Sequence, residues 1–392
     1  MSDPTADRSR AAFHMELIEA TLKQRQKLEG VVDPRSLNPQ QRGFLVAKAA
    51  LKLDDQIDPA VADAARAEAM RILCAMLGKN PQLATAFESS GIEVVVVSAN
   101  RLMTDLPEFS SLAGVGINQP GVAGASRGWD KTRGVGGVSV GNKLYVAVTE
   151  ENLLGSKVGP TVSQAGGGCY AKQYSTTSHE FAHALHIGVL DARQKGVITT
   201  AYRQRSKGLT IANDTLYFDG TLVELKAAVE KEWVDGPRMK MPGATVDYQV
   251  SDSRGTAWRN FTYRSNCKPA NCYAASDERE YFAQCVNAYL GSNGGTDPYT
   301  QRPRNNGQAW LRVHEPAALI ALLDELFSPH GTSVEAFSGF GSANLPETNT
   351  AQAARTGPTL KEVIAERKLA KQAAPGNVKA NIAMFEQMAK KK

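Results

Sequence analysis

The sequence predicts an α+β fold, in which a small mixed or antiparallel sheet is combined with helices. Three observations carry this prediction. Residues 8–90 show apolar side chains at three- and four-residue spacing, the period of helices that bury one face. Residues 91–148 contain β-branched runs and a glycine turn, which indicate strands. A helix that bears His179 and His183 follows those strands, and a second polar helix is indicated around Glu280.

The first 90 residues are expected to form a helical N-terminal subdomain. Helical segments are predicted near 8–29, 39–53 and 58–77, where the apolar spacing is clearest. Prolines punctuate these segments, namely Pro34, Pro39, Pro59 and Pro81. No combination of residues typical of a catalytic site occurs in this part of the chain, so its role is not indicated by its sequence.

Residues 91–345 are expected to form the mixed domain. The β-branched run at 91–98 is typical of a buried strand. Residues 138–140 and 144–148 indicate two short strands that turn at Gly141, and a tight turn of this kind joins antiparallel neighbours. The glycine-rich stretch before them is not expected to bind nucleotides, because no Gly-Lys-Ser or Gly-Lys-Thr follows a strand.

Further elements are expected after the histidine helix. Residues 222–233 indicate a helix, and the polar and aromatic alternation over 243–264 indicates a hairpin or an ordered loop. Two more helices are predicted at 276–290 and 315–328. A linker and a basic helical tail then complete the chain over residues 346–392.

Composition and charge narrow the class of protein. With 42% hydrophobic and 22% charged residues among 392, the chain has the composition of an ordinary globular protein. The net charge of +5 is the difference between eight basic and three acidic side chains within residues 361–392, so the remaining body is formally neutral. A neutral body lacks the electrostatic footprint of a nucleic-acid partner.

Membrane insertion and classical export are not expected from the sequence. No apolar run approaches the roughly 18 residues that a membrane-spanning helix needs. The N-terminus begins Met-Ser-Asp-Pro-Thr-Ala-Asp and lacks the basic start and apolar core of a secretory signal. The sequence therefore leaves two locations open, the cytoplasm or export by a specialised secretion route.

The segment from Ser178 to His186, Ser-His-Glu-Phe-Ala-His-Ala-Leu-His, carries the strongest chemical signal. His179 and His183 are four residues apart, so on a helix both imidazoles project from one face and can meet one metal ion. Glu180 stands beside the first histidine, where a glutamate can act as the base for a water on that ion. Thr176-Thr177-Ser178 is expected to cap this helix, apolar residues frame it, and Gly188 is expected to end it.

Two histidines and a water leave a catalytic zinc ion one protein ligand short. The segment 277–284, Asp-Glu-Arg-Glu-Tyr-Phe-Ala-Gln, offers carboxylates on a predicted helix. Glu280 and Gln284 are four residues apart and share a face, with Asp277 beside them. A carboxylate on the inner side of a helix is costly to bury unless it binds a cation. Glu280 is therefore the favoured third ligand, while Glu278, Asp277 or a purely structural helix stay open as alternatives.

His186 is a less favourable ligand. It follows His183 by three residues and could face the same side, but a helix turns away over the seven residues from His179. We expect His186 to pack, or to support the ligands, rather than to bind the ion. The longer pattern HExxHxxGxxH is absent, because His186 and Val189 occupy its glycine and third-histidine positions.

The motif HEFAH, followed at a distance by YxxxxxxEYFAQ, resembles the gluzincin metallopeptidases, in particular the group of the anthrax lethal factor catalytic domain. That group has HEFGH and then a helix with Glu-x-x-x-Glu, whose first glutamate ligates zinc. The resemblance covers roughly residues 125–330, including the Arg-Gly-Val-Gly-Gly and Glu-Glu-Asn-Leu-Leu segments. It implies a zincin-like catalytic domain, in which the HExxH helix and a second, ligand-bearing helix stand beside the small sheet.

The resemblance also implies roles for individual residues. One zinc ion would be held by His179, His183 and Glu280. Glu180 would be the general base, and Tyr273, seven residues before Glu280, would stabilise an oxyanion.

The chain departs from the pattern of that group at two points. Gln284 stands where the group has its second glutamate, so a hydrogen bond from it to a ligand histidine would be neutral. Gln284, His186 and Asp277 are the candidates for positions around the ligands. The separation of 97 residues from His183 to Glu280 is longer than in lethal factor, so we expect an insertion that folds aside.

The function predicted from these residues is that of a zinc metalloendopeptidase, a hydrolase acting on a protein or peptide, in the setting of a secreted toxin or effector. Two alternatives stay open. One is a zinc amidase that acts on a cell-wall peptide or another non-protein amide. The other is a binding module whose zinc site is not catalytic.

Overall fold

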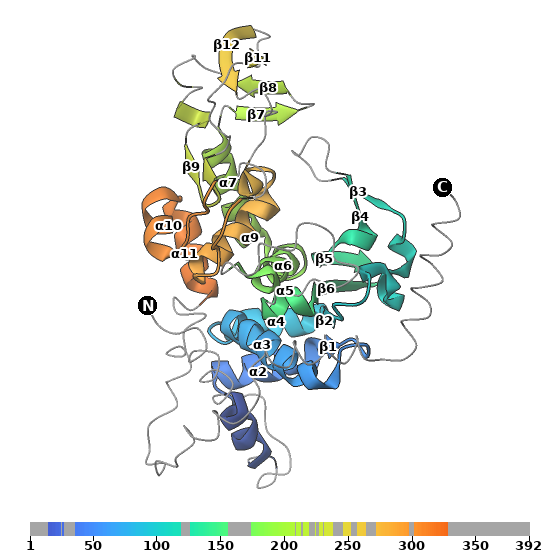
Figure 1. Ribbon diagram of the computed structural model, residues 1–392. Coiled ribbons are helices and arrows are strands. Elements are labelled where there is room, and N and C mark those ends of the chain that lie inside the picture. Colours follow the sequence, from blue (N-terminus) through green and yellow to red (C-terminus); the bar gives the residue numbers. More distant parts are fainter. Residues whose placement is uncertain are drawn as a thin grey trace, which may run out of the picture. The chain divides into compact units, whose positions relative to one another are not determined.

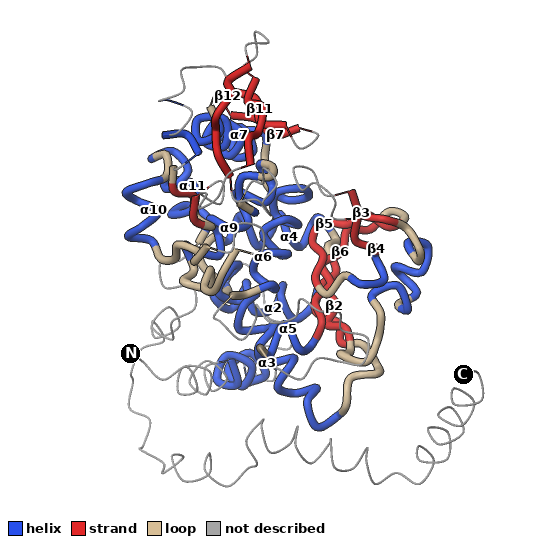
Figure 2. Tube along the Cα trace, turned by 45° about the horizontal axis from the view of Figure 1, so that its top comes forward, coloured by secondary structure: helices blue, strands red, loops and turns tan. Residues whose placement is uncertain are grey.

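A four-stranded mixed sheet forms the centre of the fold, as the computed structural model shows. Its strands are β1 (Leu51–Leu53), β2 (Glu93–Val97), β6 (Lys143–Thr149) and β5 (Gly134–Val140), in the order β1-β2-β6-β5. β1, β2 and β6 are parallel, whereas β5 is antiparallel to β6 and takes an outer position (Figures 1 and 2). The predicted strands at 91–98, 138–140 and 144–148 and the predicted mixed sheet are thereby confirmed.

The structure describes residues 15–24, 26, 36–118, 126–155, 174–207, 209–212, 215–218, 224, 227–229, 231–237, 246–251, 257–263, 272–297 and 302–327. They belong to the first of two compact units, which comprises residues 1–339. The basic helical tail predicted within 346–392 lies outside the described residues. Among the described helices, none combines the length and the apolar character that crossing a membrane demands.

The caps of the helices in the N-terminal segment explain where these helices begin. α2 (Pro39–Ala50), α3 (Pro59–Leu77) and α4 (Pro81–Ser90) each begin with proline. An Asn or Asp side chain precedes each proline and accepts hydrogen bonds from the first backbone N–H groups. Proline at the first helical position costs nothing, because its missing N–H would have no partner there. The segment predicted near 8–29 is helical over residues 15–24, where it is described.

The helix predicted over 39–53 ends earlier than expected. Leu51–Leu53 form β1 and pair in register with Val94, Val95 and Val96 of β2. The apolar spacing of a helix continues through these residues, but pairing with a buried strand prevails over that local pattern. The segment 1–90 thus contributes a strand to the central sheet, and its treatment as a separate helical subdomain stays a sequence prediction.

The histidine helix, α6 (Thr176–Ala184), is packed between several elements. Phe181 of α6 meets Phe87 of α4 with ring centroids 5.0 Å apart, and both side chains are fully buried. Beyond Ala184 the chain runs through one π-helical turn, Leu185–Val189, before α7 (Ala192–Ser206). The short α5 (Glu150–Leu154) continues directly from β6. Aromatic packing therefore ties α6 to the N-terminal helices.

Three helices complete the C-terminal part of the described chain. α9 (Glu278–Tyr289) and α11 (Ala317–Leu326) confirm the helices predicted at 276–290 and 315–328, and α10 (Gln308–His314) lies between them in sequence. Asp277 caps α9 by accepting hydrogen bonds from the N–H groups of Arg279 and Glu280. The cap fixes where α9 begins and thus which side of it carries Glu280.

The residues between α7 and α9 contain a second four-stranded sheet. Its strands are β7 (Leu209–Ala212), β8 (Thr215–Phe218), β11 (Val246–Ser251) and β12 (Ala257–Tyr263), in the order β12-β11-β8-β7. β11 and β12 are antiparallel, which confirms the hairpin predicted within 243–264. The insertion expected before Glu280 therefore has a sheet of its own.

The helix predicted at 222–233 is confirmed in part. Glu224 and residues 227–229 are helical, but Glu232–Trp233 form β9, which pairs with β10 (Gly236–Pro237). Trp233 is fully buried and Asp235 beside it is also buried, so tertiary packing decides the conformation there.

The part of the chain that the structure describes also contains two short strands and four 3₁₀ turns. The strands β3 (Gly116–Asn118) and β4 (Ser126–Gly128) pair with each other. The turns are η2 (Met103–Asp105), η3 (Pro107–Leu112), η4 (Trp129–Lys131) and η7 (Tyr273–Ala275).

Candidate metal centre

Helix α6 presents its two histidines to one point. Ser175 caps the helix, its hydroxyl accepting a hydrogen bond from the N–H of Ser178 at 3.2 Å. The predicted cap, Thr176 to Ser178, is thus wrong by one residue, because these three already lie in the first turn. His179 and His183 follow one turn apart, and they are 2% and 8% exposed. Their Nε2 atoms are 3.0 Å apart.

Glu280 of α9 meets the same two nitrogen atoms. Its Oε2 lies 3.1 Å from His179 Nε2 and 3.3 Å from His183 Nε2. This oxygen is buried, and no donor among the described residues is aligned to give it a hydrogen bond. The other carboxylate oxygen, Oε1, accepts a hydrogen bond from the Tyr273 hydroxyl at 2.9 Å. One oxygen of Glu280 is therefore satisfied by the protein, while the other points at the histidine pair.

These three atoms fit a metal ion. A divalent ion bound tetrahedrally at about 2.0–2.1 Å from its ligands keeps the ligand atoms roughly 3.3 Å apart. The separations of 3.0, 3.1 and 3.3 Å between His179 Nε2, His183 Nε2 and Glu280 Oε2 approach that value. Two imidazole nitrogens and one carboxylate oxygen form a common ligand set for such an ion. A cation at their centre would also satisfy the buried oxygen that lacks a donor.

Protonation of the three groups follows from their closeness. Burial lowers the pKa of His179 to about 4. Burial also opposes a charge on His183, but the Glu280 carboxylate outweighs it and raises the pKa of His183 to about 9. Burial disfavours the Glu280 carboxylate too, yet the charge on His183 holds its pKa well below the ordinary value. The three groups thus share one proton, which an incoming metal ion would displace.

Glu180 lies beside the histidine pair. One of its carboxylate oxygens and one nitrogen of each histidine lie within 4.8 Å of one another. Part of Glu180 stays accessible, but surrounding protein atoms exclude enough water to raise its pKa to about 8, with a further contribution from the charge of Glu280. Without a metal ion this carboxyl group therefore keeps its proton near neutral pH, and a cation bound by the histidines would lower its pKa.

Strand β5 approaches α6 so closely that only glycine fits. A Cβ built on Gly136 would lie 1.9 Å from the carbonyl oxygen of Glu180, and one on Gly134 would lie 3.1 Å from its Oε1. Gly137 has φ of 68° at a bulge in the β5–β6 pairing, and a Cβ there would lie 2.3 Å from Ile187 Cδ1. The glycines of this segment bring the β5 backbone against the candidate site.

Gln284 has a different hydrogen-bond partner from the ligand histidine that the sequence predicted. Its Nε2 donates a hydrogen bond to the hydroxyl of Tyr174 at 3.1 Å, and its Oε1 is buried without a partner among the described residues. Tyr174, which the sequence did not single out, has its ring centroid 6.0 Å from that of His179. Among the described residues, Gln284 is therefore linked to the site through Tyr174, and no direct hydrogen bond to a histidine is present.

His186 packs against α9. It lies in the π-helical turn that follows α6. Its ring packs on Phe282 of α9 with centroids 5.6 Å apart, and it is 5% exposed. The expected end of the helix at Gly188 falls inside this turn, so the chain leaves helical conformation at Leu190 instead.

A buried polar link joins α6 and α9 behind the site. The Ser178 hydroxyl donates to Asn287 Oδ1 at 2.6 Å, and Asn287 Nδ2 donates to the carbonyl of Ser175 at 3.0 Å. Asn287 is fully buried. Sequence reasoning missed this pair, because its members are 109 residues apart and no short motif relates them.

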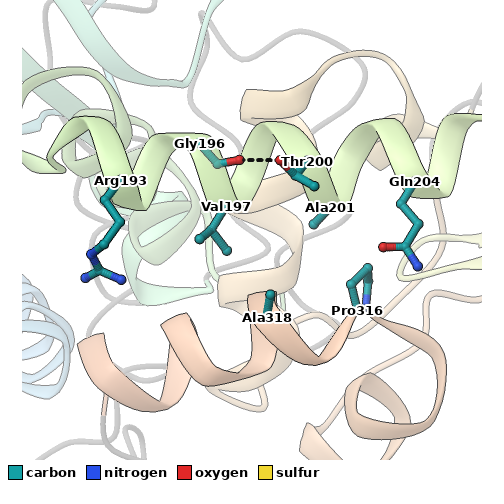
Figure 3. Close-up of a pocket in the computed structure, with 8 residues that line it drawn as sticks. All are labelled: Arg193, Gly196, Val197, Thr200, Ala201, Gln204, Pro316 and Ala318. Carbon is teal, nitrogen blue, oxygen red and sulfur yellow. Dashed lines mark hydrogen bonds between the residues drawn. The ribbon is translucent and has the colours of Figure 1, made fainter.

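A groove lies between α7 and α11, apart from the residues of the candidate site. Its volume is about 360 Å³, and Figure 3 shows Val197, Thr200 and Ala201 facing Pro316 and Ala318 across it. None of the residues that line it belongs to the histidine pair or its surroundings. The groove therefore adds nothing to the chemistry of that pair.

Comparisons with known proteins leave the family open. No family model matches the chain, and no curated protein matches it. Among solved structures, a Pro-Pro endopeptidase from Paenibacillus alvei aligns with a TM-score of 0.35 and 15% sequence identity, over 71% of this chain and 98% of that one. A function can therefore be inferred only from the residues of the candidate site.

Proposed function

We propose that this protein is a zinc-dependent endopeptidase of zincin-like fold, in which His179, His183 and Glu280 hold the metal ion. The convergence of His179 Nε2, His183 Nε2 and Glu280 Oε2 within 3.0–3.3 Å of one another carries the proposal. When bound, zinc supplies Lewis acidity, which makes water a stronger acid and polarises a carbonyl group.

Glu180 is the proposed general base. It accepts a proton from the attacking water and passes it to the amine that leaves. The position of its carboxylate beside both histidines supports this role. A glutamate next to a metal-bound water can accept the proton of that water and later return it.

Strand β5 is the proposed binding edge for the substrate. It is the outer strand of the central sheet, and its glycines place its backbone against α6. An extended peptide can pair with such an edge through main-chain hydrogen bonds, which recognise little of its sequence. This arrangement would bring a peptide bond next to Glu180.

Tyr273 is proposed to stabilise the developing oxyanion. Its ring stacks on His179, with centroids 5.6 Å apart and planes at 26°, so its hydroxyl lies near the ligands. That hydroxyl donates to Glu280 Oε1 in the structure. For this role it must exchange that hydrogen bond for one to the substrate carbonyl, which would make the interaction specific to the reacting state.

Replacement of the base is the decisive test. We expect Glu180→Gln to lower peptide hydrolysis by about 10²–10⁴-fold or more, because the amide cannot accept the proton. The metal content should stay at that of the wild type, since Glu180 is not a proposed ligand. The measurement is cleavage of a broad peptide library, with and without a chelator, together with elemental analysis of the purified protein.

Glu278→Gln is the matched control. Glu278 lies two residues from Glu280 on the same helix and was an alternative ligand by sequence, but the structure brings Glu280 to the histidines. This variant should retain both metal and activity. Full hydrolysis by Glu180→Gln would refute the proposed mechanism.

A further inference from the structure

The turn that carries Tyr273 is held by two buried carboxylates. Asp297 Oδ1 accepts a hydrogen bond from the N–H of Tyr273 at 2.9 Å, and Asp235 Oδ2 accepts one from the N–H of Ala274 at 2.8 Å. Both aspartates are 0% exposed. They come from segments 24 and 39 residues away in sequence, so the turn η7 is fixed by distant parts of the chain.

Arg304 is the cationic partner within this network. Its Nε lies 3.3 Å from Asp235 Oδ1, and its side chain is 3% exposed. Asn293 Nδ2 lies 3.4 Å from the same oxygen. A buried ion pair adds little stability compared with apolar packing of the same volume, but it has strict geometric demands. The network is therefore better suited to fix positions than to stabilise the fold.

Arg304 also reaches the second tyrosine of the site. Its guanidinium lies 4.3 Å from the ring centroid of Tyr174, in cation–π contact. The backbone of Tyr174 pairs with that of Asn293, so this tyrosine and the network are tied at two points. Tyr174 in turn lies beside His179 and accepts the hydrogen bond of Gln284.

The Asp235–Arg304 pair thus contacts both segments that carry a tyrosine beside His179, through Ala274 and through the ring of Tyr174. Tyr273 stacks on the His179 ring and donates to Glu280 Oε1. Tyr174 contacts the same ring at 6.0 Å between centroids. Through the two tyrosines, Asp235 and Arg304 are linked to the His179 ring and to the Glu280 carboxylate.

We propose that Arg304 and Asp235 are positioning residues, which hold Tyr174 and Tyr273 against His179 and so set the direction of the His179 and Glu280 ligand atoms. This inference rests on the proposed metal site. The positions of the ligand atoms would then be set by the buried Asp235–Arg304 pair, although none of the contacts described for that pair is with His179, His183 or Glu280.

The chain contains a matched pair for comparison. Arg205 and Glu315 form another buried ion pair, with Nε 3.2 Å from Oε2 and side chains 5% and 0% exposed. Arg205 lies over the ring of Trp233 at 5.3 Å, and Glu315 accepts a hydrogen bond from Tyr281. The contacts that the structure describes for this pair include neither tyrosine beside His179. Its loss should affect folding stability in a similar way without affecting the ligands.

The test is Co²⁺ binding to the full-length chain after removal of metal by a chelator. We expect Asp235→Asn and Arg304→Gln to weaken Co²⁺ affinity by about 10–100-fold, the usual effect of losing support around a metal ligand. Their d–d absorption bands at saturation should also differ from those of the wild type. Glu315→Gln should change neither quantity, and circular dichroism at the titration temperature shows that each variant is folded.

Wild-type affinity and an unchanged cobalt spectrum in folded Asp235→Asn and Arg304→Gln overturn the inference. Should Arg304→Gln not fold, Arg304→Lys, which keeps the charge but not the flat guanidinium over Tyr174, is measured instead by the same criteria.

A further variant, Glu280→Gln, separates this inference from the proposed function. It should weaken Co²⁺ binding more than any other variant, because it replaces a ligand. If it leaves the binding unchanged, then the proposed ligand set is wrong and the inference falls with it. If Glu280→Gln weakens binding and the Asp235 and Arg304 variants do not, then only the inference is refuted.

Discussion

Helix α6 is flanked by two elements that hold it in opposite ways. On one side, strand β5 contacts it through glycines, so that backbone lies against backbone. On the other side, α9 contacts it through side chains, among them Glu280, which meets the histidines, and Asn287, which meets Ser178. The contact with β5 requires that the glycines have no Cβ atom. The contact with α9 requires the polar side chains of Glu280 and Asn287.

This difference follows from the chemistry proposed for each side. A strand that offers its main chain to a peptide needs its backbone close to the site, and a Cβ at Gly136 would prevent that approach. A helix that supplies a ligand must instead carry a carboxylate into a buried place and hold it there by a cap. The two sides should therefore respond to opposite substitutions, since β5 is sensitive to added atoms and α9 to removed ones.

The largest effect on stability is expected on the β5 side. In Gly136→Ala the new Cβ would lie 1.9 Å from the Glu180 carbonyl oxygen, so β5 and α6 must separate. We expect a loss of about 3 kcal/mol or more in the free energy of unfolding, the upper range for overpacking. Urea denaturation measures it. The control is Gly196→Ala on α7, where nothing lies within 4 Å of the new Cβ. A Gly136→Ala variant as stable as the wild type would contradict the close contact.

An intermediate effect is expected on the α9 side. Asn287→Ala removes the acceptor of the Ser178 hydroxyl and the donor to the Ser175 carbonyl, so two buried hydrogen bonds are lost and only longer contacts of the Ser178 hydroxyl, at 3.4 Å, remain. The expected loss is about 2 kcal/mol. A double-mutant cycle with Ser178→Ala isolates the pair, because the second substitution should cost less once Asn287 is gone. Additive losses in that cycle would mean that the two side chains are not coupled.

The smallest effect concerns pH and the end of α6. Burial lowers the pKa of His186 to about 4, so between about pH 6.5 and 4 the unfolded chain binds a proton there that the folded chain does not. The stability contributed by this residue is therefore present above pH 6.5 and is lost as the pH falls through that window. In His186→Phe the fall should be shallower than in the wild type, by about 1 kcal/mol at pH 6. Thermal melts from pH 8 to 4.5 compare the two, and parallel curves would contradict the burial of a neutral imidazole.

The sequence predicted best those features that depend on neighbours in the chain. The β5–β6 turn at Gly141 has φ of 59°, which glycine tolerates, and α9 begins at an aspartate cap, so both are encoded locally. The convergence of His179 and His183 follows from helix geometry alone, and the structure brings Glu280 to them. That Glu280 serves as a metal ligand, and that Tyr273 donates a hydrogen bond to an oxyanion, stay predictions.

Features that depend on distant contacts could not be predicted. β1 looked helical because its leucines fit a helical spacing, and only its pairing with β2 makes it a strand. Tyr174 and Arg304 lie 130 residues apart in sequence, and no short pattern brings an arginine to a tyrosine over such a separation. The π-helical turn that contains His186 likewise has no signature in its residue types.

The place of β1 in the sheet has a consequence for any shortened form of this protein. Residues Leu51–Leu53 cover the outer edge of β2, whose partner positions Val94 to Val96 are β-branched and buried. A chain that begins at residue 91 would expose the unpaired N–H and C=O groups of an apolar strand, a template for pairing with other chains. Cleavage between the helical segment and the rest would therefore favour self-association over a released, active fragment.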